Sequence, residues 1–147
     1  MPDLVYEYRH LVSFEDTNLV GNVYYTNHLK WQGRCREMFV RDRAPGLIEE
    51  LAQGLGIVTT RCSCEYHGEL HVYDEVSVRM RIGRMTPSTI TMLFEYFRVQ
   101  DGVEEKVATG EQRVAFVRRE DVEVVPVPIP ASLRAALEDF GIRVPRA

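Results

Sequence analysis

The stretch DTNLVGNVYYTNHLKWQGRCRE, residues 16–37, holds the polar residues whose spacing could do chemistry. A loop with Asp16, Thr17, Asn18 and Gly21 leads directly into a segment with helical spacing. The free N–H groups and the positive dipole end of a helix start can stabilise the charge that develops on a carbonyl oxygen under attack. Any helix start has such groups, however, and Asp16, Thr17 or Asn22 could merely cap it.

Asn18 occupies the position where an acid or a base would be expected. A neutral amide cannot take a proton near neutral pH, but it can donate to and accept from a water molecule and so orient it. Asn18 could equally be the first residue of an Asx-turn that stabilises the loop, and the two roles are compatible. Catalysis here would therefore depend on positioning and on oxyanion stabilisation.

The elements that must position this loop are a strand before it and a helix after it. Residues 4–14 are rich in aromatic and β-branched residues and predict a strand. Residues 23–41 predict a helix that is buried on most sides, because two neighbouring stripes follow helical spacing. The first stripe is Tyr24, His28, Trp31, Cys35 and Met38, and the second is Tyr25, Leu29, Gln32 and Arg36.

After Pro45-Gly46 the chain changes to strand-like patterns. Alternation of apolar and polar residues is clearest from Val76 to Gly83, as in a half-buried strand. Thr86-Pro87 marks a break, and Asp101-Gly102 is a strong hairpin signal. The predicted segments are a short helical turn at 47–54, strands at 56–66, 74–85, 88–99 and 105–118, a stiff extended connection at 125–130 and a helix at 131–140.

This order predicts one α+β domain, residues 1–147, in which an antiparallel sheet wraps around one long central helix. A single helix leaves apolar sheet surface and an open sheet edge uncovered. We therefore expect a homodimer with a continuous sheet, or a dimer of such dimers.

Composition narrows the class of protein. The chain has 147 residues, 45% of them hydrophobic, and a net charge of −4. There is no basic stripe for nucleic acid and no apolar run of membrane-spanning length. The N-terminus lacks signal-peptide features, so we expect a cytoplasmic protein. Cys35, Cys62 and Cys64 lack metal-ligand spacing, and we expect reduced thiols, no metal and no cofactor.

The loop and helix start resemble those of hotdog-fold acyl thioesterases of the 4-hydroxybenzoyl-CoA thioesterase type. The matching residues run from Phe14 through Asp16, Asn18, Gly21 and Val23 to Tyr24-Tyr25. The catalytic Asp of that family falls on Asn18, and the Glu that many members carry in the helix falls on Gly33. Asn18 together with WQGRCRE, residues 31–37, resembles the thioesterases of enediyne antibiotic pathways, which release a conjugated polyene from an acyl carrier protein domain.

The resemblance implies roles for individual residues. The backbone N–H of Tyr25 would be the oxyanion donor, and Asn18 and Arg36 would be linked with turnover. Arg36 could instead form a salt bridge with a nearby glutamate such as Glu37, Glu49 or Glu65. Glu65 could serve the partner subunit's site, although solvation on an edge strand is the commoner fate of such a residue. We expect the substrate to contact Gly21, Tyr24, His28 and Leu29, although His28 could instead be a plain core histidine.

Three functions follow. The first is hydrolysis of a polyene thioester, with a β-keto or β-hydroxy acyl chain, on the acyl carrier protein of an iterative enediyne polyketide synthase. The second is a general acyl-CoA thioesterase activity. The third, motivated by the missing carboxylate, is a non-catalytic polyene-binding module.

Overall fold

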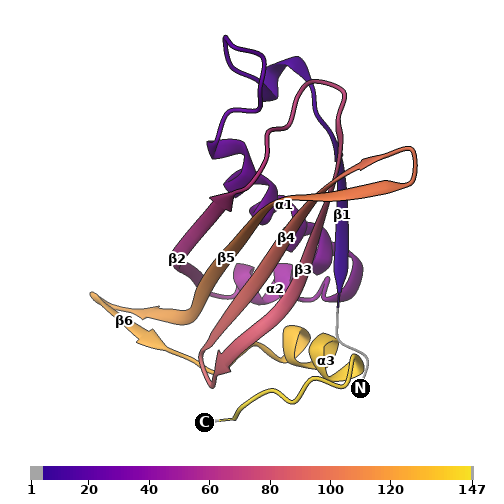
Figure 1. Ribbon diagram of the computed structural model, residues 1–147. Coiled ribbons are helices and arrows are strands. Elements are labelled where there is room, and N and C mark those ends of the chain that lie inside the picture. Colours follow the sequence, from indigo (N-terminus) through magenta and orange to yellow (C-terminus); the bar gives the residue numbers. More distant parts are fainter. Residues whose placement is uncertain (1–4, 147) are drawn as a thin grey trace.

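The chain forms a curved antiparallel sheet with its helices on one side (Figure 1). The structure is a computed structural model and describes residues 5–146. Within that range the sheet has six strands in the order β1-β3-β4-β5-β2, with β6 paired to β5. The strands are β1 (Tyr6–Leu11), β2 (Leu55–Tyr66), β3 (Glu75–Thr86), β4 (Thr89–Gln100), β5 (Val103–Glu120) and β6 (Glu123–Pro126).

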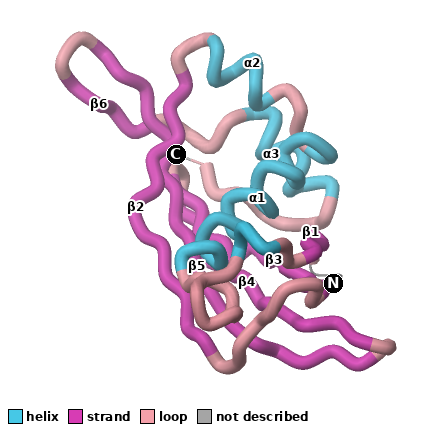
Figure 2. Tube along the Cα trace, turned by 90° about the horizontal axis from the view of Figure 1, so that it is seen from above, coloured by secondary structure: helices cyan, strands magenta, loops and turns pink. Residues whose placement is uncertain are grey.

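The helices gather on the concave side of the sheet (Figure 2). Over the described residues they are the 3-10 turn η1 (Phe14–Asp16) and the α-helices α1 (Thr26–Arg43), α2 (Leu47–Ala52) and α3 (Ala131–Asp139). The central helix α1 contacts β1, β2, β3 and β5. An antiparallel sheet around one long helix confirms the predicted α+β hotdog architecture.

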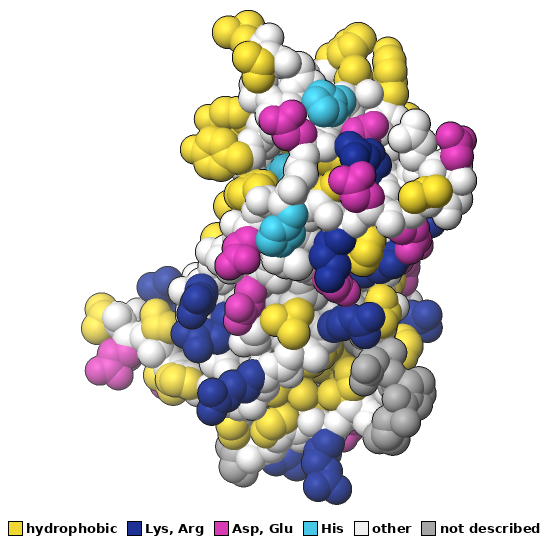
Figure 3. All heavy atoms as spheres, viewed as in Figure 1, with side chains coloured by type: hydrophobic (Ala, Val, Ile, Leu, Met, Phe, Trp, Pro, Cys, Tyr) yellow, Lys and Arg dark blue, Asp and Glu magenta, His cyan; other side chains and the backbone are white. Residues whose placement is uncertain are grey.

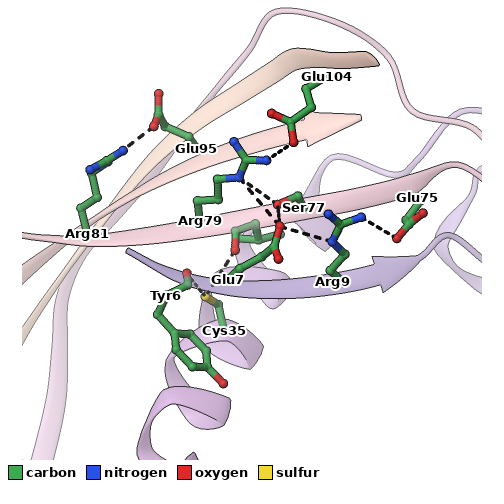
Figure 4. A network of polar contacts seen from close by, with 11 residues as sticks. Tyr6, Glu7, Arg9, Cys35, Glu75, Ser77, Arg79, Arg81, Glu95 and Glu104 are labelled. Atoms are coloured by element: carbon green, nitrogen blue, oxygen red, sulfur yellow. Dashed lines mark hydrogen bonds and ion pairs between the residues drawn. The ribbon is translucent and has the colours of Figure 1, made fainter. Parts of the chain in front are cut away.

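The two faces of the sheet differ in chemistry. On β4, the inward side chains Ile90, Met92, Phe94 and Tyr96 are all buried, as the period of two requires. The outward face is covered instead by charged pairs (Figures 3 and 4), including Arg9 with Glu75, Arg79 with Glu104 and Arg81 with Glu95. The uncovered apolar face that the sequence led us to expect is therefore largely shielded, and the open edge remains.

The predicted chain reversals are confirmed. Asp101 and Gly102 have φ values of 51° and 78°, and two consecutive positive φ values suit the tight turn of a two-residue hairpin. The break at Thr86-Pro87 separates β3 from β4. These local signals worked because the turn geometry restricts which residue types can occupy it.

The boundaries around the loop were predicted less well. The strand β1 covers Tyr6–Leu11 rather than 4–14, and residue 4 lies outside the described residues. The helix α1 begins at Thr26 rather than at residue 23. Val23 is still extended, because it bridges to Thr17 and donates its N–H to the Leu70 carbonyl at 2.7 Å.

One further expectation needs correction. The strand β6 was not predicted, since the prolines from Pro126 onward suggested only an extended connection; it pairs with the end of β5. The helix α1 is buried or half-buried on most sides, as predicted. Its buried residues are His28, Trp31, Gln32, Cys35 and Phe39, and the exposed residues Lys30, Arg34, Glu37 and Arg41 lie on one stripe.

Candidate active site

The loop before α1 is organised by Asp16. Its carboxylate accepts hydrogen bonds from the Ser13 N–H at 3.0 Å and the Ser13 hydroxyl at 3.2 Å, and it lies 2.8 Å from His10 Nε2. Burial alone raises the pKa of Asp16, but the contacts from Ser13 and His10 outweigh it and hold the pKa below its usual range. The buried carboxylate of this loop is thus ionised and already hydrogen-bonded.

The backbone of Asp16 ties this loop to the helix start. Its carbonyl accepts the Tyr24 N–H at 2.9 Å and the Asn27 side-chain amide at 2.8 Å. The sequence suggested Asp16 only as a helix cap. Its role in joining β1, the loop and the helix start was not predicted, because no local sequence pattern links Asp16 to His10 on β1.

Asn18 forms the predicted Asx-turn. Its Oδ1 accepts the Val20 N–H at 2.9 Å, and its backbone carbonyl accepts the Gly21 N–H at 3.0 Å. Gly21 has φ +94°, a conformation that favours glycine. Among residues 5–146 nothing accepts a hydrogen bond from the Asn18 side-chain NH₂. The turn therefore fixes the oxygen of the side chain and leaves its donor for a ligand.

The start of α1 presents free backbone donors. Tyr25 is the N-cap residue and already has helical angles, φ −57° and ψ −29°. The Asn27 N–H bonds to the Tyr24 carbonyl at 3.0 Å, but within the described chain the N–H groups of Tyr25 and Thr26 have no acceptor. Two adjacent amides at a helix start can bind an oxyanion. The Tyr24 and Tyr25 side chains beside them are largely exposed.

Below this turn lies a box of aromatic side chains around His28. The imidazole is 3% exposed, and its ring packs against Tyr66, Trp31 and Tyr96 at centroid distances of 4.7, 5.3 and 5.5 Å. Burial lowers the pKa of His28, and the Tyr25 backbone partly opposes the shift. Within residues 5–146 neither ring nitrogen has a hydrogen-bond partner. His28 is therefore a neutral, inward-facing side chain that lies under the turn.

One turn further along α1, Gln32 is fully buried and donates from Nε2 to the Ser63 carbonyl at 2.9 Å. Gly110 on β5 makes room for it, because a Cβ there would lie 2.2 Å from Gln32 Nε2. Leu29, on the flank of this face, is half-buried.

The next turn carries Arg36. Its Nη1 donates to Gln112 Oε1 at 2.8 Å, so its partner is neutral and the expected salt bridge is absent from the described residues. Burial lowers the pKa of Arg36, although a guanidinium stays charged at neutral pH. Gln112 was not anticipated, because only the register of β5 brings it opposite α1.

Arg36 lies in the wall of a cavity of about 350 Å³ between the sheet and the helices. This volume falls in the range of small-molecule sites. The lining is almost wholly apolar and comes from the last turns of α1, from α2 and α3, and from the sheet, including Phe39, Leu51, Met80, Met92, Val114 and Leu133. The cavity was not predicted from the sequence, since its walls come from seven elements.

Glu65 lies away from this arrangement. It is exposed and borders a shallow depression with Ser63, Arg81, Glu95 and Glu111, which is the outward face of the sheet. Within one subunit Glu65 is therefore not brought to the turn at the start of α1. The described residues also contain no group of three or more His, Cys, Asp or Glu side chains that could hold a metal ion.

The three thiols are free, as expected. Burial raises the pKa of Cys35 to about 12 and that of Cys64 to about 11, so neither is a thiolate nucleophile at neutral pH. No helix within residues 5–146 has the length and apolar character needed to cross a membrane.

Comparison with known proteins assigns the chain to a family. Residues 12–137 match the model of the thioesterase-like superfamily. The dynemicin thioesterase, in crystal structures concerned with polyene binding, is 46% identical with a TM-score of 0.88 over 92% of this chain and 96% of that chain. A 4-hydroxybenzoyl-CoA thioesterase is 15% identical, with a TM-score of 0.78 over 90% and 97% of the two chains. A putative esterase of Aquifex aeolicus (strain VF5) is 22% identical over 121 residues, 82% of this chain and 90% of its own length.

The fold and the match define a hotdog-fold thioester hydrolase. The chain belongs to the thioesterase-like superfamily, and its likeness to the dynemicin thioesterase agrees with the resemblance that residues 14–37 suggested.

Proposed function

We propose that the protein hydrolyses the thioester of a long conjugated acyl chain, with a β-keto or β-hydroxy group, carried by the acyl carrier protein of an iterative enediyne polyketide synthase. The likeness to the dynemicin thioesterase, whose structures concern polyene binding, supports this substrate class. The observation that carries the proposal is the apolar cavity at the far end of the helix whose start presents free amides.

The geometry of α1 favours a long substrate. His28, Gln32 and Arg36 lie on successive turns of its inward face. Tyr25 precedes Arg36 by eleven residues, which is about 16 Å along an α-helix. An acyl chain with its carbonyl at Tyr25 must be long to reach the cavity. The charge of Arg36, which has only a neutral partner, suits an oxygen-bearing part of that chain.

The chemistry needs no general base in the turn. The thioester oxygen accepts the Tyr25 N–H, a water oriented by Asn18 adds to the carbonyl carbon, and the C–S bond breaks to release the thiol and the acid. The proton lost by the water passes through solvent to the departing sulfur, so that the products are the carboxylic acid and the thiol. Because a thioester is an activated ester, positioning and oxyanion stabilisation are sufficient.

We also propose that two copies associate through the free edge of β2. One edge of the sheet ends at β2, whose backbone groups on that side have no strand partner in the described chain, and open edges favour pairing. Sedimentation at micromolar concentration should give a dimer or a dimer of dimers. A monomer would contradict this.

Thiol release from acyl carrier protein and from coenzyme A, loaded with the same long polyene acyl group, tests the function. We expect a higher kcat/KM with the carrier. Equal or faster turnover of the coenzyme A ester would favour a general acyl-CoA thioesterase. Tight binding of the polyene without release of either thiol would favour a binding module.

A further inference from the structure

Tyr66, the last residue of β2, reaches back to the catalytic turn. Its hydroxyl donates a hydrogen bond to the Tyr25 carbonyl at 2.7 Å. The two residues are 41 positions apart in the chain, so this contact is formed only by the fold. In the sequence, Tyr66 marked only the end of a strand.

The atoms involved give the contact its significance. The Tyr25 carbonyl belongs to the same peptide unit as the Thr26 N–H, and the Tyr25 N–H belongs to the unit before it. Neither N–H has an acceptor among residues 5–146. A hydrogen bond to an amide oxygen polarises the amide and strengthens its N–H as a donor. The Tyr66 hydroxyl thus acts on the peptide that adjoins the proposed oxyanion donor.

The turn is held from two sides. Asp16 fixes the preceding residue through the Tyr24 N–H, and Tyr66 fixes the Tyr25 carbonyl from the sheet. The Tyr66 ring is braced edge-on against His28, at 4.7 Å with an interplanar angle of 81°. Burial, together with nearby Cys64, raises the pKa of Tyr66 to about 12, so the hydroxyl remains a donor at neutral pH.

The exposure of Tyr66 argues against a purely structural role. Within one subunit the residue is 44% exposed, so water could satisfy its hydroxyl if the contact with the Tyr25 carbonyl were lost. By contrast, Tyr96, whose hydroxyl bonds to the His28 carbonyl at 2.6 Å, is completely buried. The core of the subunit therefore does not require the hydrogen bond from Tyr66 to the Tyr25 carbonyl.

We propose that Tyr66 is a positioning residue for thioester hydrolysis, which orients and polarises the Tyr25–Thr26 peptide at the oxyanion site. This inference rests on the proposed function. It also makes the end of strand β2 a direct determinant of turnover.

Tyr66→Phe removes only the hydroxyl. We expect kcat to fall about 10-fold, the value of one net hydrogen bond, with KM and the melting temperature nearly unchanged. Tyr73→Phe is the matched control. Tyr73 is 69% exposed and its hydroxyl has no partner in the described residues, so its loss should leave kcat unaltered. Replacing Tyr66 by 3-fluorotyrosine keeps the donor and should keep kcat at or above the wild-type value.

A spectroscopic measurement tests the oxyanion site and the role of Tyr66 separately. The probe is an acyl pantetheine in which CH₂ replaces the sulfur and the carbonyl carbon is ¹³C, so that it cannot be hydrolysed. We expect its infrared carbonyl stretch to fall on binding to the wild type and to recover part of that shift in Tyr66→Phe.

The outcomes are distinct. No shift in the wild type would overturn the oxyanion site itself. A shift that persists undiminished in Tyr66→Phe, with unchanged kcat, would overturn the role of Tyr66 and leave the proposed function intact. A fall in kcat with 3-fluorotyrosine would assign the effect to ring packing and also overturn the role.

Discussion

The two ends of helix α1 differ in chemistry: the start is polar and open, and the last turns border an apolar cavity. At its start, backbone and side-chain polar groups are held by short hydrogen bonds around Asp16 and Asn18, and the surface is open. Toward its end, apolar side chains enclose a cavity and the main polar contact is that between Arg36 and Gln112. In the proposed function, chemistry takes place at the first end and chain recognition at the second, so the two ends should respond to different substitutions.

The largest effect should come from filling the cavity. Val114 is 3% exposed and lines it, and Val114→Phe would exclude about four methylene groups of a bound chain. At about 0.8 kcal/mol for each buried methylene, kcat/KM for a long acyl chain should fall about 200-fold.

A butanoyl thioester is the control for this variant, because it does not reach the cavity and should react within about two-fold of the wild-type rate. Equal losses with both chain lengths would show that the cavity is not the recognition end. Thiol release against chain length measures both.

Next in size is the loss of the Asp16 carboxylate. Asp16→Asn removes the charge that Ser13 and His10 stabilise, and it should lower the free energy of unfolding by about 2 kcal/mol at pH 7. Because the folded pKa of Asp16 lies below the ordinary value of 3.8, its contribution is complete above that pH and is lost as pH falls through the folded pKa.

Urea unfolding of the wild type and Asp16→Asn at several pH values tests this sign. The difference between the two proteins should be constant from about pH 5 to 7 and should shrink below about pH 4, where wild-type Asp16 also becomes neutral. A difference that grows on acidification would contradict the assignment.

Asn18→Ala should act only on the chemical end. We expect kcat to fall about 10-fold, since one positioning hydrogen bond is lost, and the reduction should be the same for short and long chains. The fold should persist, because the Asx-turn is one of several bonds in the loop. A fall in kcat confined to long acyl chains would contradict the assignment of chemistry to the start of α1 and chain recognition to its end. Unchanged turnover would show that Asn18 only stabilises the turn.

The sequence predicted these two ends unequally. The loop was recognisable because turns and helix starts restrict residue types locally, as Asn18 and Gly21 show. The order of the strands along the chain was predicted from the alternation of apolar and polar residues and from the turn residues between them. The cavity, the Arg36–Gln112 contact and the Tyr66 contact depend on strand register and on residues 41 or more positions apart, and no local pattern encodes such distances. The start of α1 was placed three residues early. Residues from 23 onward have helix-like spacing in the sequence, but Val23 is held in an extended bridge with Thr17, and the helix begins only at Thr26.

The smallest predicted effect is that of pH on the wild-type enzyme. A site that uses a carboxylate base loses activity as that group protonates. Here Asp16 is occupied by His10 and Ser13, and Asn18 does not titrate, so kcat/KM should be nearly flat from about pH 6 to 8. On the acid side, we expect His28 to limit the stability of the fold and to have no part in the reaction itself. Its pKa is lowered from 6.5 by burial, so the unfolded chain takes up a proton first and stability declines as pH falls below 6.5.

Asn18→Asp provides the contrast within the same loop. The new carboxylate would lie in the loop that leads into the helix start, whose positive dipole end favours the ionised form, and an acid limb should appear as it protonates. The measurement is kcat/KM against pH for the wild type, Asn18→Asp and Glu65→Gln, each with a melting curve at every pH to separate unfolding from catalysis. Because Glu65 faces outward in its own subunit, its substitution should leave the profile flat. An acid limb in the folded wild type that disappears in Glu65→Gln would instead make Glu65 the base, contributed by a partner subunit, and the chemical end of α1 would then work by proton transfer rather than by position.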